Sequence, residues 1–221
     1  SGEGGEGVCV WVGGDEIHAR RAVLCAGSGN EALLAPMLHR LGLQGADVFQ
    51  RRPLHMVYGI GAPVTLFGHC VQQLSDKPRL TVTTSPATNG RGSVWYLGGE
   101  LAETGVPRDE AAQIEAARVA LAGCLGWIET SRMELRCVRV DRAEGRTPDG
   151  RRPEGPVIRA FGPVLACWPT KLALAPLLAS RVMAEVFGRD GGKGSDGGEA
   201  SALTDVQACV ARPPWDGEDT R

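Results

Sequence analysis

Apolar positions in the first fifth of the chain form short runs separated by glycine turns. Residues 8–12 and 16–19 flank a Gly-Gly-Asp turn, a pattern that predicts a β-hairpin. The continuous apolar run 22–26 predicts a strand, which leads through Gly27-Ser28-Gly29-Asn30 into the helical composition of residues 31–38. A strand, a glycine turn and a helix in this order are typical of a nucleotide-binding unit.

The middle of the chain has the pattern of an antiparallel sheet with one long helix. Residues 79–85 and 93–99 are rich in β-branched and aromatic side chains, and residues 133–140 alternate between polar and apolar. Acidic residues in the first turn and apolar residues at helical spacing predict a helix over residues 107–127. Of the neighbours Trp95 and Tyr96, one should face the core while the other could line a pocket.

Near the C-terminal end, a buried strand is followed by a buried helix. Residues 157–167 are apolar and broken by Gly162-Pro163, which predicts a strand with a turn. The Leu/Ala-rich residues 168–187 predict a helix that ends at Gly188, and this helix either kinks at Pro176 or begins late. A strand that breaks into a helix directs N–H groups and a positive helix end at one point, which suits an anion or an electron-rich ring.

These elements predict an α/β plus α+β fold in four segments. Residues 1–45 and 154–188 form two pieces of a nucleotide-binding domain, and residues 46–153 form an inserted antiparallel-sheet domain with one long helix. Residues 189–221 are first glycine-rich and charged, then extended, which predicts a flexible loop and a tail that could dock onto the body.

Composition narrows the class of protein. The 221 residues are 43% hydrophobic, enough for a sizeable core, and the net charge of -2 gives no electrostatic reason to bind nucleic acid or an anionic membrane. No apolar run reaches the roughly 20 residues that span a bilayer. The first residues lack an initiator Met and a signal-peptide pattern. We therefore expect a soluble, cytoplasmic piece of a longer protein.

The cysteines predict neither a metal centre nor a disulfide framework. No pair has C-x-x-C spacing, and most are flanked by apolar residues. We expect reduced, buried thiols and no metal site. The seven residues are Cys9, Cys25, Cys70, Cys124, Cys137, Cys167 and Cys209.

The glycine turn has two interpretations. Gly27, Gly29 and Ala32 satisfy G-x-G-x-x-A, and Asp47 lies at about the distance of a ribose-binding acid, as in a primary dinucleotide fingerprint. However, Asp47 precedes an apolar run instead of ending a strand, and a hairpin before such a unit is foreign to it. The preferred interpretation is a later strand of a similar domain, whose glycines let the backbone pass close to a cofactor.

Arginines and turn residues crowd the segment 141–153. This segment is either a solvated charged loop or a turn from which Arg142 reaches a pocket and holds a carboxylate through two hydrogen bonds. His55 and His69 are candidate proton acceptors, although lone histidines near apolar segments are more often structural.

The order of these features resembles the C-terminal part of FAD-dependent oxidoreductases of the D-amino-acid oxidase, glycine oxidase and glycerol-3-phosphate dehydrogenase superfamily. Residues 22–30 resemble the strand that leads to an Ala-Gly turn beside the flavin. Arg142 with Thr147-Pro148-Asp149-Gly150 resembles the turn whose arginine binds the substrate acid group, and residues 168–186 resemble the last helix, which faces the flavin ring.

The resemblance implies a partial FAD/NAD(P)-binding Rossmann-like domain with an inserted substrate domain. It implies FAD as cofactor, an amino or hydroxy acid as substrate, and hydride transfer to the flavin. Lys171, with the N–H groups of Thr170 and Lys171, would stabilise negative charge on the reduced flavin, and Arg142 and Lys171 are the catalytic candidates. The implied cofactor contacts are Ala26, Gly27, Ser28, Trp168, Pro169, Thr170, Lys171 and Leu172, and the implied substrate contacts are Arg142, Arg146 and Tyr96.

Three departures from the family pattern affect these expectations. The family's first strand with G-x-G-x-x-G is absent, which predicts a fragment with weak or no FAD retention. Glu144-Gly145-Arg146 replaces the usual Arg-Pro, so Arg142 or Arg146 could bind the acid, and Cys167 to Lys171 replace the closing glycine turn. Two alternatives stay open: a small NAD(P)-binding protein that uses Gly27, Gly29 and Ala32, and a non-catalytic interaction domain derived from a flavoenzyme.

Overall fold

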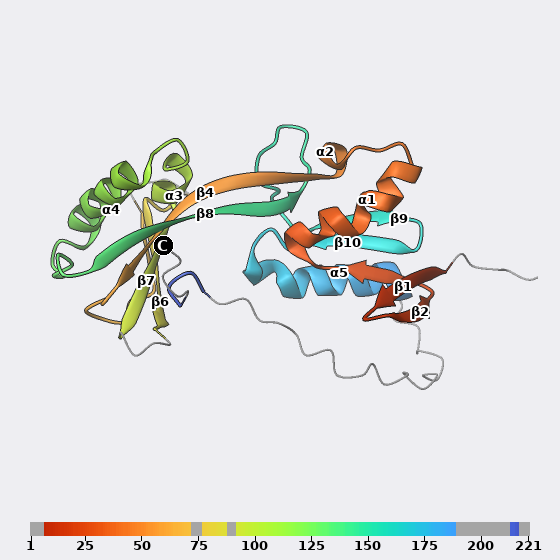
Figure 1. Cartoon of the computed structure of the whole chain (residues 1–221), viewed down its shortest axis with the longest axis horizontal. Helices are drawn as coiled ribbons and strands as arrows, with labels where there is room; N and C mark the ends of the chain where they lie inside the picture. The colour runs from red at the N-terminus through yellow and green to blue at the C-terminus, as the bar shows by residue number, and fades with distance from the viewer. Residues whose placement is uncertain (1–6, 72–76, 88–91, 189–212, 217–221) are drawn as a thin grey trace, which may run out of the picture. The chain divides into compact units, whose positions relative to one another are not determined.

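A computed structural model describes residues 7–71, 77–87, 92–188 and 213–216 (Figure 1). The chain divides into two compact units. The first unit contains residues 1–52 and 142–208, and the second contains residues 53–141 and 209–221. The predicted loop and tail at 189–221 lie outside the described residues, apart from residues 213–216.

The first unit contains a hairpin, a three-stranded sheet and two longer helices. The predicted hairpin is confirmed: its two strands pair antiparallel, and Gly13 and Gly14 both have positive φ, as short hairpin turns often require. The elements are β1 (Val8–Val12), β2 (Asp15–Ala19), β3 (Ala22–Leu24), the 3-10 turn η1 (Gly27–Gly29), α1 (Asn30–Arg40), α2 (Gly45–Val48), β9 (Val157–Phe161), β10 (Val164–Trp168), the 3-10 turn η2 (Leu172–Leu174) and α5 (Ala175–Phe187).

Strand β10 is the centre of this unit. It lies between β3, to which it is parallel, and β9, to which it is antiparallel. All five of its residues are buried. Alternate side chains point to opposite faces: Ala166 and Trp168 pack in a cluster with Leu34 of α1, whereas Leu165 and Cys167 pack with Leu178 of α5. The two helices therefore cover the two faces of β10.

The second unit is a five-stranded sheet in the order β5-β6-β7-β4-β8. Strands β4 and β8 also contribute residues to the first unit. The elements are β4 (Phe49–Ile60), β5 (Gly68–Cys70), β6 (Leu80–Pro86), β7 (Ser93–Gly98), α3 (Glu100–Thr104), α4 (Glu110–Leu125) and β8 (Glu134–Gly145).

Successive side chains of strand β7 point to opposite faces of this sheet. Trp95 is fully buried in a cluster with Leu121 and Leu125 of α4, and its indole N–H donates to the Val64 carbonyl at 2.8 Å. Tyr96 lies on the opposite face, where it is half-buried beside Tyr58 and Val94. The expectation that one of the two neighbouring aromatic residues faces the core is confirmed.

Two of the following three elements differ from the sequence prediction, and the third, the C-terminal helix, follows one of its two predicted alternatives. The apolar run 157–167 is a hairpin of two strands, with Gly162 at φ 57 in its turn. The C-terminal helix begins only at Ala175, with Pro176 in its first turn, where proline needs no N–H partner. Residues 141–145, predicted as a loop or turn, continue strand β8. The sequence prediction ended the strand too early because the buried Glu144 is a charged residue and interrupts the apolar pattern.

Among the described residues, no helix is both long and apolar enough to cross a membrane.

Candidate functional site

The carboxyl ends of β3 and β10 emerge side by side in the first unit. The two strands are parallel, with Leu24 paired to Ala166, so the turns that follow each strand leave the sheet at the same edge. Ligands of open α/β sheets bind at this edge. Two predicted groups of cofactor residues lie at the ends of these strands: Ala26, Gly27 and Ser28 after β3, and residues 168–172 from the last residue of β10 onward.

Asn30 ties the two strand ends together. It is fully buried, its side-chain oxygen accepts a hydrogen bond from the Ala26 N–H at 2.9 Å, and its side-chain nitrogen donates to the Cys167 carbonyl at 3.3 Å. From the sequence alone, Asn30 is expected only to be a turn residue. The amide is suited to this position because it donates and accepts at once.

The turn after β3 presents backbone at the surface. Ala26, Gly27 and Ser28 are exposed. Gly27 has a φ of 59, which favours glycine, and space is open within 4 Å of the position that a Cβ would take. A flat or charged group can therefore approach this backbone without meeting a side chain of residue 27.

The turn after β10 has an unusual backbone. Thr170 is the sole non-glycine with positive φ in the described part of the chain, at 64, and its hydroxyl donates to the Gly155 carbonyl at 2.9 Å. Such a conformation costs about 1–3 kcal/mol and is frequent at functional sites. Lys171 and Leu172 are exposed, whereas Trp168 is buried with an indole N–H that has no acceptor among the described residues.

The backbone donors at this turn differ from the prediction. The Lys171 N–H donates to the Pro169 carbonyl at 2.7 Å and is therefore engaged. Because α5 begins at Ala175, neither Thr170 nor Lys171 lies in its first turn. The structure thus leaves the Lys171 side chain, and not its N–H, available to a ligand.

The two candidate carboxylate-binding arginines have different environments. Arg142 is half-buried on β8, while Arg146 is exposed just after that strand. The backbone of Arg146 is fixed: its N–H donates to the Val48 carbonyl at 2.9 Å, and its carbonyl accepts from Arg159 at 3.0 Å. Both arginines belong to the first unit.

Between these arginines, Glu144 is the centre of a buried polar network. It is 1% exposed, and its two carboxylate oxygens accept hydrogen bonds from Arg52 at 2.7 and 2.9 Å. Gln50 also reaches Glu144, at 3.4 Å, and donates to the carbonyls of Gly150 and Arg151 while accepting from the Thr147 N–H. This network holds the Thr147–Gly150 turn in place.

Sequence reasoning missed the network because Gln50 and Arg52 lie more than 90 residues before Glu144. The structure also shows that the next residue, Gly145, has no room for a side chain, because a Cβ there would meet Val157. Neither feature can be recognised from the local sequence.

The remaining candidates lie in the second unit. Tyr96 is on β7, on the sheet face opposite α4, and burial raises the pKa of its hydroxyl. His55 is 3% exposed with Nδ1 3.1 Å from the Gly105 carbonyl, a structural environment, whereas His69 is exposed on β5. These contacts favour the structural interpretation of His55.

The expectation of buried cysteines holds only for Cys167. Six cysteines are described and all are free thiols, but Cys9 and Cys25 are exposed. Burial, with the nearby Cys25 as a smaller cause, raises the pKa of Cys167 to about 12. That thiol is therefore protonated and unreactive at neutral pH.

One group of side chains has metal-ligand chemistry. On the β1–β2 hairpin, Cys9 and His18 are cross-strand partners, and each lies about 3 Å from a Glu16 oxygen, at 3.0 and 3.1 Å. All three are exposed. The prediction of no metal site stays a prediction.

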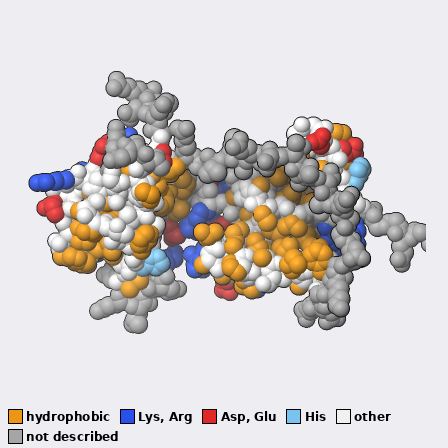
Figure 2. Space-filling model, turned by 90° about the horizontal axis from the view of Figure 1, so that it is seen from below, with side chains coloured by type: hydrophobic (Ala, Val, Ile, Leu, Met, Phe, Trp, Pro, Cys, Tyr) orange, Lys and Arg blue, Asp and Glu red, His pale blue; other side chains and the backbone are white. Residues whose placement is uncertain are grey.

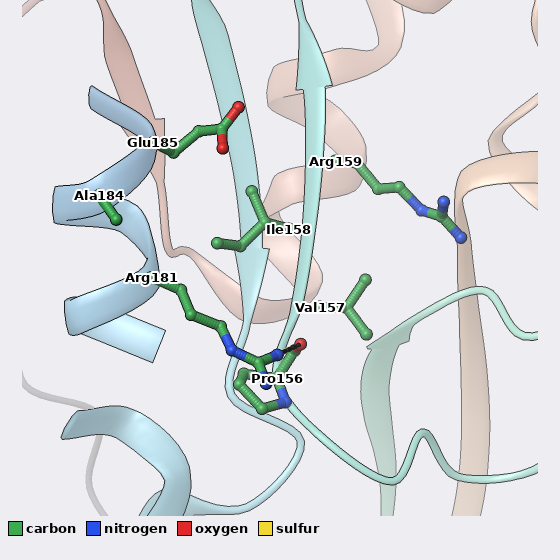
Figure 3. Close-up of a pocket in the computed structure, with 7 residues that line it drawn as sticks. All are labelled: Pro156, Val157, Ile158, Arg159, Arg181, Ala184 and Glu185. Atoms are coloured by element: carbon green, nitrogen blue, oxygen red, sulfur yellow. Dashed lines mark hydrogen bonds between the residues drawn. The ribbon is translucent and has the colours of Figure 1, made fainter. Parts of the chain in front are cut away.

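A cavity of about 540 Å³ lies elsewhere in the first unit, between β9 and α5 (Figure 3). Its two arginines already bind the chain: Arg181 donates to the Pro156 carbonyl at 3.3 Å, and Arg159 turns away toward the Arg146 carbonyl. The cavity is not lined by any predicted cofactor or substrate residue.

Comparison with known proteins points to one class, the FAD-dependent oxidoreductases, although no family model matches the chain. The chain is similar to the probable FAD-dependent oxidoreductase PA4991 of Pseudomonas aeruginosa, with 46% identity over 217 residues, which cover 97% of this chain and 53% of that protein. The crystal structure of PA4991 matches with a TM-score of 0.75 over 92% of this chain and 54% of that one. The chain thus spans about half the length of this relative.

Proposed function

We propose that this chain is part of an FAD-dependent oxidoreductase that oxidises a small amino acid or hydroxy acid. The observation that carries the proposal is the 46% identity to PA4991 over 97% of the chain. At this identity two chains share their fold, and the crystal structure of PA4991 agrees with a TM-score of 0.75. The description of PA4991 specifies no substrate. The proposed substrate class therefore rests on the chemistry of the two arginines discussed below.

The strand ends of the first unit fit a flavin nucleotide. The exposed Ala26–Ser28 backbone can pass close to a flat group, and the buried Trp168 indole N–H has no acceptor among the described residues. We propose that Ala26, Gly27 and Ser28 bind FAD from one side. The contacts proposed on the other side are Trp168, Pro169, Thr170, Lys171 and Leu172. This arrangement would make the first unit a partial Rossmann-like domain.

The chain's residues would bind and orient the substrate. When bound, FAD supplies hydride acceptance from a carbon that bears an amine or hydroxyl group. Arg142 would hold the acid group through two charge-assisted hydrogen bonds, since a half-buried guanidinium loses less of this energy to solvent than the exposed Arg146. The Lys171 ammonium group would add positive charge after β10.

Two features support the proposal that further residues complete the first unit. Strand β3 pairs with β10 on one edge, and its other edge has no partner strand among the described residues. Helix α5 also exposes an apolar surface, at Leu172 just before it and at Leu177, Met183 and Phe187, each 43% exposed or more (Figure 2). We propose that a strand and packing surface of the nucleotide-binding domain cover these positions in the complete enzyme.

The NAD(P) alternative has less support. A primary dinucleotide unit needs a parallel strand after its first helix, but the parallel neighbour of β3 is β10, far along the chain. Asp47, the candidate ribose ligand, lies in the short helix α2 and accepts a hydrogen bond from the Gln44 N–H at 3.0 Å. Asp47 is therefore a helix-capping residue.

The visible absorption spectrum tests the proposal. The 221-residue chain and a protein extended by its upstream coding sequence are purified in parallel. A flavin band in the extended protein, bleached anaerobically by an amino or hydroxy acid, is the expected result. If the extended protein is colourless and the short chain binds a nicotinamide nucleotide, the proposal is wrong. A stable, colourless protein that binds neither nucleotide would indicate a non-catalytic interaction domain.

A further inference from the structure

The β1–β2 hairpin of the first unit has one half-buried face and one exposed face. Burial alternates along the paired parts of both strands, as expected when successive side chains point to opposite sides. Val10 and Ile17 lie on the half-buried face, whereas Cys9, Glu16 and His18 lie on the exposed face. The exposed face therefore carries a thiol, a carboxylate and an imidazole.

The hairpin brings these three side chains together. Cys9 and His18 are cross-strand partners, and Glu16 lies two positions before His18, on the same face. The Cys9 Sγ and the His18 Nε2 lie 3.0 and 3.1 Å from one atom, the Glu16 Oε1. The three ligand atoms all lie within 4.8 Å of one another. In a tetrahedral zinc site such atoms are separated by about 3.3–3.5 Å, so small side-chain rotations would place all three around one ion.

The chemistry of the three groups suits zinc. Thiolate, carboxylate and imidazole are the usual protein ligands of this ion. Binding breaks the S–H bond of Cys9: the proton passes to solvent, and the thiolate donates an electron pair to the metal. The thiolate and the Glu16 carboxylate together then balance the two positive charges of the ion.

The surroundings of the three side chains give an ion access. The side chains of Glu16 and His18 are 43% and 78% exposed, so an ion reaches them directly from solvent. A hollow of about 430 Å³ lies beside Cys9 and His18, and Arg20 is also part of its lining. A tetrahedral ion with three protein ligands keeps a fourth position for water, and this hollow provides room for it.

We propose that Cys9, Glu16 and His18 form a site for a single zinc ion on the exposed face of the hairpin. The ion would link β1 to β2, which pair with no other strand in the part of the chain that the structure describes. Cysteine spacing predicts no metal site, because it considers only pairs of nearby cysteines. This site uses one cysteine, and the hairpin turn places it opposite a Glu-x-His pair.

The test uses Co²⁺ as the probe, because a thiolate bound to cobalt gives a charge-transfer band in the near ultraviolet. The reduced, metal-free 221-residue chain, without a polyhistidine tag, is titrated with Co²⁺ and then with Zn²⁺. A single Co²⁺ should bind with this band, and Zn²⁺ should displace it. Cys9→Ser should abolish the band. His18→Gln should weaken Co²⁺ binding at least about tenfold, since even the loss of a group that only orients a ligand costs about 10- to 100-fold.

Cys25→Ser is the matched control, because Cys25 is another exposed free thiol of the same unit. It should leave the band and the affinity unchanged. Absence of the band in the parent chain, a band that survives Cys9→Ser, unchanged affinity in His18→Gln, or loss of the band in Cys25→Ser would each overturn the inference. The substituted ligand positions are exposed, so both variants should fold like the parent, which circular dichroism checks. No flavin takes part, so the result is independent of the proposed function.

Discussion

The side-chain amide of Asn30 donates a hydrogen bond to the Cys167 carbonyl at 3.3 Å, across 137 positions of sequence. The same amide accepts from the Ala26 N–H, so one buried side chain sets the spacing between the two turns proposed to bind FAD. These turns belong to segments that are distant in the sequence. Their mutual position therefore depends on Asn30 as well as on the β3–β10 pairing.

Asn30→Ala should destabilise the chain by about 1–3 kcal/mol, because the Ala26 N–H and the buried Cys167 carbonyl both lose their side-chain partner. Urea unfolding measures the change. Asn30→Asp keeps the acceptor for Ala26 but puts a carboxylate oxygen beside the Cys167 carbonyl in a buried site, so it should destabilise the chain at least as much as Asn30→Ala. Ser28→Ala, at an exposed neighbouring position, should stay within about 0.5 kcal/mol of the parent. An unchanged urea midpoint for Asn30→Ala would contradict the role assigned to this residue.

Glu144→Gln should destabilise the chain by about 3–5 kcal/mol, because the change leaves Arg52 without its counter-charge in a buried site. Glu31→Gln is a close control: Glu31 also accepts two hydrogen bonds from an arginine, Arg51, at 2.8 and 2.9 Å, but the Glu31 side chain is 24% exposed whereas that of Glu144 is 2% exposed. Its loss should cost at most about 1 kcal/mol. Similar unfolding energies for the two variants would show that burial does not strengthen the Glu144 pair.

Arg142→Met should raise the KM of the flavin-bleaching acid by roughly 30-fold or more, because a charged acid group would lose its bidentate partner. Arg146→Met should change KM less than about threefold, since an exposed ion pair contributes little. The kcat of both variants should change far less than the KM of Arg142→Met. The reverse pattern would assign the acid group to Arg146.

Stability should fall above about pH 9 because of Cys167. Its folded-state pKa is raised to about 12, from an ordinary value of 9.0. Between these pH values the unfolded chain releases a thiol proton that the folded chain keeps. The stabilisation that Cys167 contributes to the folded state is therefore complete below pH 9 and is lost as pH rises toward 12. The slope is at most about 1.4 kcal/mol per pH unit. Urea unfolding at pH 8 and pH 10 should show a smaller loss in Cys167→Ala, and equal losses would contradict the shift.

Local patterns predicted much of the fold. The hairpin at residues 8–19, strands β6 and β7, helix α4 and the expectation that one of Trp95 and Tyr96 faces the core all follow from periodicity and turn chemistry within a few residues. The end of β8 could not be found this way. Its Glu144 looks like a solvent-exposed loop residue until Arg52, 92 positions earlier, is placed beside it.

The candidate site shows the same division. Local sequence indicated the glycine turn after β3 and the break after β10, since each is a strand followed by turn residues. It did not indicate Asn30, because this residue acts through a contact with a position more than 100 residues away. The late start of α5 was left open because Pro169 and Pro176 both fit a first helical turn.

The buried Arg52–Glu144 pair has a consequence for sequence variation. Loss of one charge alone leaves the other charge uncompensated in a buried site, so a homologue with a change at one position should also have a change at the other. Replacement of both residues by apolar ones is compatible with a stable fold, since such exchanges often have little effect on stability. Positions 52 and 144 should therefore vary together among homologues, and the identity of one should predict the other even where the surrounding loop differs in length.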